Sequence, residues 1–281
     1  PMSESPFLLC TDLDRTLLPN GTQPESPRAL QRFARFVGHP AVTLAYVSGR
    51  HLALVQAAIA DYGIPAPDFA ITDVGTKIYS RDGDWQVWPD WEAEIDPDWA
   101  GHDHAALKAF FADLNDLRPQ EDEKQNTHKL SYYLPLHADQ VALDRLMRER
   151  LDKRGVRASL VWSIDEPAGV GLLDVLPERA TKLHAIEFLR ERLGISLEWT
   201  LFAGDSGNDL PVMASEVPSV LVANASEDVR ESAVSHAQAG GHGQALYLAK
   251  GGLLAMNGNY SAGILEGVVH YRPELAGWME P

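Results

Sequence analysis

Short apolar runs alternate with amphipathic stretches along much of the chain, and this alternation predicts strands that alternate with helices. Apolar runs of strand length lie at residues 7–12, 41–47, 69–72, 200–203 and 219–222. Helix-like stretches follow at 26–37, 51–61, 179–193 and 260–270, the first of them expected to open at Ser26-Pro27, a capping serine before a proline. Strands that alternate with helices form a parallel sheet covered on both faces. We therefore predict a Rossmann-like, doubly wound α/β core.

The pattern changes between the third and fourth of these strands. Residues 77–100 combine turn residues with four tryptophans, which either stack on a sugar or fill a small hydrophobic core. Further strands and helices are expected at 103–115, 128–135, 138–154, 156–163 and 169–176. The first pattern then returns. We predict a catalytic core at 1–78 plus 177–281, with a smaller α/β cap domain inserted at 79–176.

Composition and charge narrow the class of protein. The 281 residues are 45% apolar and 23% charged, which is ordinary for a globular protein, and no apolar run approaches the length of a membrane-spanning helix. No signal-peptide pattern is present, and the single cysteine, Cys10, excludes an intramolecular disulfide. We expect a cytoplasmic monomer. The net charge of −16 argues against nucleic acid and anionic membranes as partners, and requires local cations for any anionic substrate.

Two aspartates follow the first predicted strand directly. Asp12 and Asp14 are two residues apart, so both side chains can point to the same side of the sheet, at the carboxyl edge where open α/β folds bind ligands. One carboxylate can attack phosphorus, while the other serves as general acid and base. An isolated Asp-x-Asp pair is also compatible with a solvated loop or a simple cation site.

A second acidic cluster follows the strand predicted at 200–203. Asp205 and Asp209 flank Gly207-Asn208, and carboxylate oxygens of this kind suit Mg²⁺. The alternative interpretation is structural: a helix cap with an acidic residue in the first turn, which favours the helix dipole. The two roles are compatible.

Two further stretches offer phosphate ligands. Ser48-Gly49-Arg50 ends a predicted strand and opens a predicted helix, where a hydroxyl and free amides can bind phosphate, although an ordinary capping serine is the simpler interpretation. Lys182 lies in the first turn of a predicted helix, a position where positive charge is unfavourable unless an anion lies nearby.

These stretches together resemble the phosphohydrolases of the haloacid dehalogenase superfamily. Three more segments narrow the resemblance to sucrose-phosphate phosphatase and its close relatives: Thr72–Tyr79, the cap segment Gln125–Tyr133 and the tail Ser261–Glu266. The similarity covers nearly the whole chain. It implies a Mg²⁺-dependent phosphatase that acts on a sugar phosphate, with sucrose 6-phosphate as the first candidate and a sucrose-phosphate synthase-type glycosyltransferase as a possible partner protein.

The resemblance also implies roles for individual residues. Asp12 would be the nucleophile and Asp14 the general acid and base; Asp12, the Asp14 carbonyl, Asp205 and Asp209 would hold Mg²⁺. Ser48 and Lys182 would bind the phosphoryl group. The substrate-binding residues implied are Gly49, Arg50, Gly75, Gln125, Asn126, Lys129, Ser131 and Asn208.

The chain departs from the family pattern at two positions. Arg15 stands where the family usually has a small or amide residue, and its guanidinium can contact substrate or pair with Asp14. Leu183 follows the lysine where glycine is common. Neither change removes a catalytic group.

The residues leave other functions open. The same chemistry can serve phosphorylated mannosylfructose, glucosylglycerate, glucosylglycerol or trehalose. A phosphomutase also uses an aspartyl-phosphate but forms an isomer instead of free phosphate. The fold can also serve binding alone, as a sugar-phosphate-binding subunit of a glycosyltransferase.

Overall fold

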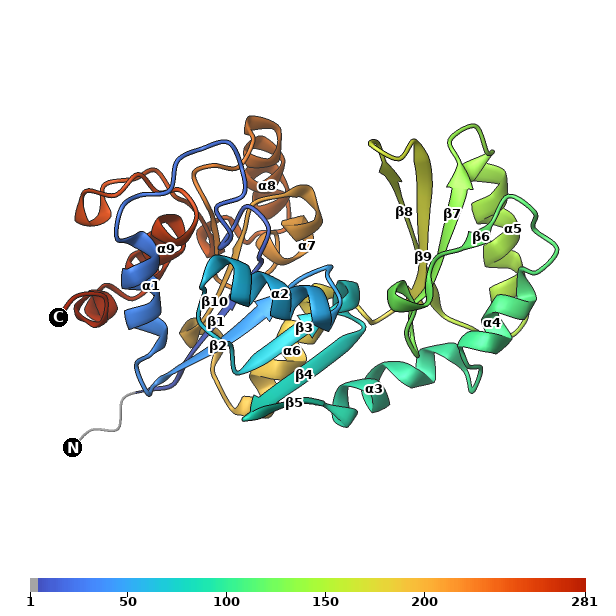
Figure 1. The fold of residues 1–281 in the computed structure, drawn as a ribbon, viewed down its shortest axis with the longest axis horizontal. Helices are drawn as coiled ribbons and strands as arrows, with labels where there is room; N and C mark the ends of the chain where they lie inside the picture. The colour runs from blue at the N-terminus through green and yellow to red at the C-terminus, as the bar shows by residue number, and fades with distance from the viewer. Residues whose placement is uncertain (1–4) are drawn as a thin grey trace. The chain divides into compact units, whose positions relative to one another are not determined.

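The computed structural model describes residues 5–281 of the chain, which fold as two compact units (Figure 1). The core unit contains the described residues up to Thr72, together with Tyr79–Gln86 and Lys182–Pro281. The cap unit contains Asp73–Ile78 and Val87–Thr181. The chain thus passes between the units at more points than a single insertion at 79–176 requires. The predicted domain boundaries stay a prediction.

An eight-stranded sheet forms the centre of the core unit, in the order β12-β11-β10-β1-β2-β3-β4-β5 (Figure 1). Neighbouring strands from β12 to β3 pair in parallel, as predicted. The strands are β1 (Phe7–Thr11), β2 (Val42–Val47), β3 (Phe69–Thr72), β4 (Lys77–Asp82), β5 (Asp84–Val87), β10 (Thr200–Gly204), β11 (Ser219–Leu221) and β12 (Leu246–Leu248). From β1 the chain winds outward through β2 and β3, and from β10 it winds the opposite way. The topological switch point therefore lies between β1 and β10, where doubly wound sheets bind ligands.

Helices connect the parallel strands and supply much of the core. They are α1 (Ala29–Val37), α2 (Leu52–Tyr62), α6 (Lys182–Leu193), α7 (Leu210–Met213), α8 (Glu227–Ala239) and α9 (Ser261–Tyr271). Phe7 and Leu9 of β1 share one buried cluster with Phe33 of α1 and Leu265 of α9. Alternate residues of a strand face opposite sides, so α1 and α9 cover one face of the sheet. Among the described residues, no helix is long and apolar enough to cross a membrane.

The cap unit is built on a separate antiparallel sheet in the order β6-β7-β9-β8, made of β6 (Arg118–Pro119), β7 (Leu130–Pro135), β8 (Ala158–Asp165) and β9 (Val170–Pro177). Its helices are α3 (Pro89–Ile95), α4 (His104–Phe110) and α5 (Gln140–Asp152). Trp99 is fully buried in one cluster with Leu107 of α4, Met147 of α5 and Leu173 of β9. Trp91 is also fully buried, and its Nε1 donates to the Gly75 carbonyl at 3.0 Å. Trp99 therefore helps to fill the core of the unit, and Trp91 is buried outside that cluster.

Some predicted elements differ from the structure. The helix expected at 26–37 begins only at Ala29, and its N-cap is Arg28 in a left-handed conformation. Ser26 does not cap it, because the Ser26 hydroxyl accepts a hydrogen bond from the Asn257 amide at 2.8 Å. A long-range contact therefore overrides the local capping signal. Helix α8 and strand β12 were absent from the sequence prediction; α8 carries polar and small residues, so its periodicity is weak.

Cys10 lies within β1 with no exposed surface, and burial raises the pKa of its thiol strongly. Because the thiolate is the reactive species, we expect native Cys10 to react with Ellman's reagent at least about 10³-fold more slowly than in guanidinium chloride. Absorbance of the released thiolate measures both rates. Stoichiometric labelling of the native protein within minutes would contradict the burial.

Candidate active site

The site begins at the switch point of the sheet. Asp12 follows the last residue of β1, Asp205 follows the last residue of β10, and these two strands pair in parallel with Thr11 opposite Ala203. The register therefore places the two carboxylates side by side at the carboxyl edge. Asp12, Asp205 and Asp209 are all buried, and each offers an oxygen within 4.8 Å of the others.

Asp209 reaches this group through a tight turn after β10. Its Oδ2 accepts hydrogen bonds from the amides of Asp205 at 3.1 Å and Ser206 at 3.3 Å, forming a capping box with Ser206. Gly204 leaves the necessary room, since a Cβ there would lie only 2.7 Å from Asp209 Oδ2. The structural interpretation of Asp209 as a capping residue is therefore confirmed. It coexists with a place in the aspartate triad.

Lys182 is a buried cation that pairs with two members of the triad. It is the first residue of α6, and its Nζ lies 3.3 Å from Asp209 Oδ1 and 3.8 Å from Asp12 Oδ1. The unfavourable charge at a helix start thus has its anionic partners, as the sequence indicated. Burial opposes the charge on Lys182, but Asp12 and Asp209 outweigh it and raise the pKa of the ammonium.

The electrostatics of the triad favour a divalent cation. Burial, followed by repulsion from Asp209, raises the pKa of Asp12 well above its ordinary value despite Lys182; burial likewise raises the pKa of Asp205. Three carboxylates and one ammonium leave two negative charges in a buried site. Mg²⁺ matches both the charge and the oxygen ligands, so the residues present fit this metal. Asp12 and Asp205 would hold it, with Asp209 supporting them.

Asp14 is held separately from the triad. Arg50 donates from Nε to Asp14 Oδ2 at 2.9 Å and from Nη2 to Asp14 Oδ1 at 2.7 Å, while Asn20 donates to Oδ1 at 2.8 Å. The Arg50 hydrogen bonds are the main cause of a lowered pKa for this half-buried carboxyl, against the opposing effect of burial. The Asp14 side chain is therefore not a member of the triad, and the metal contact of its carbonyl stays a prediction.

A cavity of about 420 Å³ opens at this edge of the core unit. It brings together six residues predicted from the sequence: Asp12, Asp14, Ser48, Gly49, Arg50 and Asn208. Ser48 is buried, its hydroxyl accepts from the Arg50 amide at 3.0 Å, and α2 begins later with His51 as its N-cap. The simpler interpretation of Ser48 as an ordinary helix cap is therefore wrong.

The sequence reading missed three residues of this site. Asn20 and Ser206 line the cavity, and the Thr16 hydroxyl donates to Asp205 Oδ1 at 2.9 Å. Thr16 is four residues after Asp12, so its proximity to the acidic pair was visible in the sequence. Its partner Asp205 is 189 positions further along the chain, and only the fold joins them.

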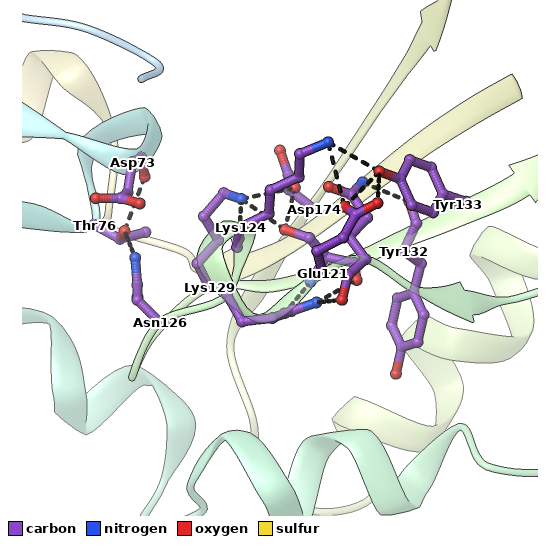
Figure 2. Close-up of polar contacts among 12 residues, drawn as sticks. Asp73, Thr76, Glu121, Lys124, Asn126, Lys129, Tyr132, Tyr133 and Asp174 are labelled. Atoms are coloured by element: carbon purple, nitrogen blue, oxygen red, sulfur yellow. Dashed lines mark hydrogen bonds and ion pairs between the residues drawn. The ribbon is translucent and has the colours of Figure 1, made fainter. Parts of the chain in front are cut away.

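The predicted sugar-binding residues lie in the cap unit, where they form part of a polar network (Figure 2). Lys129 donates to Ser131 Oγ at 2.8 Å, and Ser131 donates to Asp174 Oδ1 at 2.6 Å. Asn126 donates to Thr76 Oγ1 at 2.8 Å, next to Gly75. Asp174 was not among the predicted site residues, although it lies opposite Ser131 in the β7–β9 pair.

Gln125 is engaged within the same unit at both ends of its amide. Its Nε2 donates to the carbonyls of Gln120 and Ser131, and its Oε1 accepts from the Ser131 amide at 2.8 Å. This side chain fixes the cap segment against β7. Its contact with a sugar stays a prediction, as do those of Asn126, Lys129 and Ser131.

Comparison with known proteins agrees with this geometry. Residues 5–272 match the family described as sucrose-6F-phosphate phosphohydrolase. A putative HAD-like hydrolase of Nitrosococcus oceani is 54% identical over 98% of this chain and 74% of its own. The sucrose-phosphatase of Synechocystis, solved with sucrose and phosphate, is 27% identical with a TM-score of 0.70, covering 95% of this chain and 98% of its own. A glucosylglycerol-phosphate synthase of Pseudomonas anguilliseptica is 29% identical over 94% of this chain, which spans only 31% of that protein.

An aspartate triad with a buried lysine at the switch point, joined to a unit with its own antiparallel sheet, defines a phosphohydrolase of the haloacid dehalogenase superfamily, subclass IIB. Within that class the chain belongs to the sucrose-6F-phosphate phosphohydrolase family. It is a sugar-phosphate phosphatase.

Proposed function

We propose that this protein hydrolyses the phosphate monoester of a disaccharide-sized sugar, with sucrose 6-phosphate as the first candidate, through an aspartyl-phosphate on Asp12. The observation that carries the chemistry is the buried group of Asp12, Asp205 and Asp209, with Lys182 paired to Asp12 and Asp209. The family match and the Synechocystis structure support the choice of sucrose phosphate.

In the first half-reaction, an oxygen of Asp12 attacks phosphorus as the bond from phosphorus to the sugar oxygen breaks. Asp14 gives its proton to that leaving oxygen. Lys182 and Ser48 hold the phosphoryl oxygens. In the second half-reaction water attacks phosphorus, its proton passes to Asp14, and Asp12 is released. Mg²⁺, when bound, supplies positive charge that offsets repulsion between the carboxylates and the phosphate.

Arg50 opposes the first of these proton transfers as the structure stands. Its two hydrogen bonds stabilise the ionised form of Asp14, which suits a base and not an acid. We propose that this ion pair loosens when substrate binds, so that Arg50 contacts substrate and Asp14 takes up its proton.

A second candidate substrate is glucosylglycerol phosphate. The match to the Pseudomonas synthase covers nearly the whole of this chain, and the name of that protein concerns this compound. Because the matched segment forms part of a larger synthase, we also propose a sugar-phosphate glycosyltransferase as the partner that supplies the substrate.

The direct test is release of inorganic phosphate from sucrose 6-phosphate, glucosylglycerol phosphate, mannosylfructose phosphate, trehalose 6-phosphate and glucose 6-phosphate, with Mg²⁺ or with EDTA. We expect Mg²⁺-dependent release, with kcat/KM at least about 100-fold higher for a disaccharide-sized ester than for glucose 6-phosphate, because the cap network adds contacts realised in the transition state.

Thermal unfolding with and without Mg²⁺ provides the control, since a metal that binds only the folded state raises the midpoint. Equal rates across the panel would contradict a dedicated sugar site. Isomerised sugar phosphate without free phosphate would identify a phosphomutase. Mg²⁺ binding without turnover of any ester, together with co-purification of a glycosyltransferase, would favour a binding subunit.

A further inference from the structure

Arg15 departs from the family pattern, and the structure places it on the divide between two cavities of the core unit. It lines the catalytic cavity of about 420 Å³ together with Asp12 and Asp14. It also lines an adjoining cavity of about 470 Å³ together with Asp205 and Asn224. Of the residues that line the second cavity but not the first, the proposed reaction uses only Asp205.

The backbone of Arg15 is held in a conformation that does not favour arginine. Its φ is 58°, in the left-handed region that glycine and asparagine adopt more readily than other residues. The Arg15 amide donates to Asn20 Oδ1 at 2.7 Å, and its carbonyl accepts from Asn224 Nδ2 at 2.7 Å. The side chains of Asn20 and Asn224 therefore hold the Arg15 backbone in this strained conformation. An amide residue would fit this position better, so the arginine is a candidate for a role of its guanidinium.

The Arg15 guanidinium has N–H groups that can still bind a ligand. Its Nε lies 3.5 Å from Asp205 Oδ2, a single loose contact, and 60% of the Arg15 side chain is exposed. Arg50, in contrast, makes two short hydrogen bonds to Asp14 and is 29% exposed. Arg50 is thus committed to a protein carboxylate. Arg15 can bind a planar anion without first giving up a strong partner.

The negative net charge of the protein makes an exposed cation beside a cavity relevant to the binding of acidic substrates. A net charge of −16 repels a substrate that carries acid groups, so each such group needs a local cation. Lys182 is the proposed ligand of the phosphoryl group, and Arg15 adds positive charge on the side of the second cavity. A neutral sugar offers Arg15 hydroxyl acceptors but no opposite charge.

We propose that Arg15 and the adjoining cavity form a subsite for a second anionic group of the substrate, a carboxylate on the alcohol that leaves the phosphate. This inference rests on the proposed phosphatase function and extends it to acidic glycoside phosphates. Sucrose 6-phosphate lacks such a group and leaves the subsite empty.

The test uses two probes that differ only at this group, the 3-phosphates of glucosylglycerate and glucosylglycerol, where a carboxylate replaces a hydroxymethyl. Calorimetry measures both dissociation constants in the presence of Mg²⁺, on the full chain carrying Asp12→Asn so that neither probe is consumed. We expect tighter binding of the carboxylate probe. Adding Arg15→Asn should reduce that preference about five- to thirtyfold, the range of a partly exposed ionic hydrogen bond.

Arg28→Asn is the matched control, because Arg28 also has a left-handed backbone, with a φ of 69°, but lies at the start of α1, outside the residues that line the two cavities. It should leave the preference intact, and Arg15→Lys should retain part of it. Equal preference in the Arg15→Asn and Arg28→Asn proteins would overturn the subsite. Failure of the unmodified chain to release phosphate from these probes and from every ester of the panel above would instead overturn the proposed function, since the binding comparison does not require turnover.

Discussion

Asp12→Asn is expected to lower turnover of the best phosphosugar about 10⁴-fold or more, because an amide cannot attack phosphorus. The substitution keeps the shape of the side chain. It also removes one charge from a buried site where burial and Asp209 disfavour the ionised form of Asp12. The metal-free variant should therefore be more stable than the unmodified protein, by about 1–3 kcal/mol. Phosphate release and thermal unfolding in EDTA measure the two effects.

Opposite signs for activity and stability are the informative part of this result. Substitution of a residue that only supports the fold would lower activity and stability together. Asp61→Asn serves as the control, since Asp61 is an exposed acid on α2 and should leave both quantities unchanged. Retention of full turnover by Asp12→Asn would overturn the aspartyl-phosphate mechanism. Lower stability in EDTA would show that Lys182 outweighs the repulsion from Asp209.

Lys182→Met is expected to have the opposite effect on stability. The Lys182 side chain is 10% exposed, and its ammonium faces Asp12 and a fully buried Asp209, so its loss leaves buried carboxylates without their cation. We expect the metal-free protein to lose about 3–5 kcal/mol of unfolding free energy, the usual cost of breaking a buried ion pair. Turnover should fall about 10²–10³-fold, because the proposed mechanism loses the cation that would bind the phosphoryl oxygens.

Unfolding measured with added Mg²⁺ distinguishes this loss of charge compensation in Lys182→Met from a simple packing defect. A divalent cation replaces part of the missing charge, so saturating Mg²⁺ should restore more stability to Lys182→Met than it adds to the unmodified protein. Lys250→Met, at an exposed lysine of the core unit, is the matched control and should show no such difference. The same midpoint in EDTA for Lys182→Met and the unmodified protein would mean that Lys182 does not compensate the aspartates.

Much of the core could be predicted because its signals are local. β1 and β10 are continuous apolar runs followed at once by acids, and parallel strands align their carboxyl ends, so Asp12 and Asp205 could be expected to meet. The unfavourable charge of Lys182 at a helix start pointed to an anionic partner, and Asp12 and Asp209 are found there.

Elsewhere the signal depends on distant parts of the chain. Ser26 is a good capping residue, yet its hydroxyl binds the Asn257 amide instead, 231 positions away. The partner of Arg15 also differs from the one that the sequence allowed. Sequence alone allowed a pair with Asp14, but Arg50 occupies that carboxylate and Arg15 lies against Asp205. A hydrogen bond between segments far apart leaves no periodicity in either of them.

The parallel core and the aspartates at its carboxyl edge follow from the sequence, because residue spacing and strand direction are local properties of the chain. Which ions pair follows from the packing of distant segments, since a carboxylate binds whichever cation lies within reach. This packing commits Arg50 to Asp14, pairs Lys182 with Asp12 and Asp209, and leaves Arg15 exposed between two cavities.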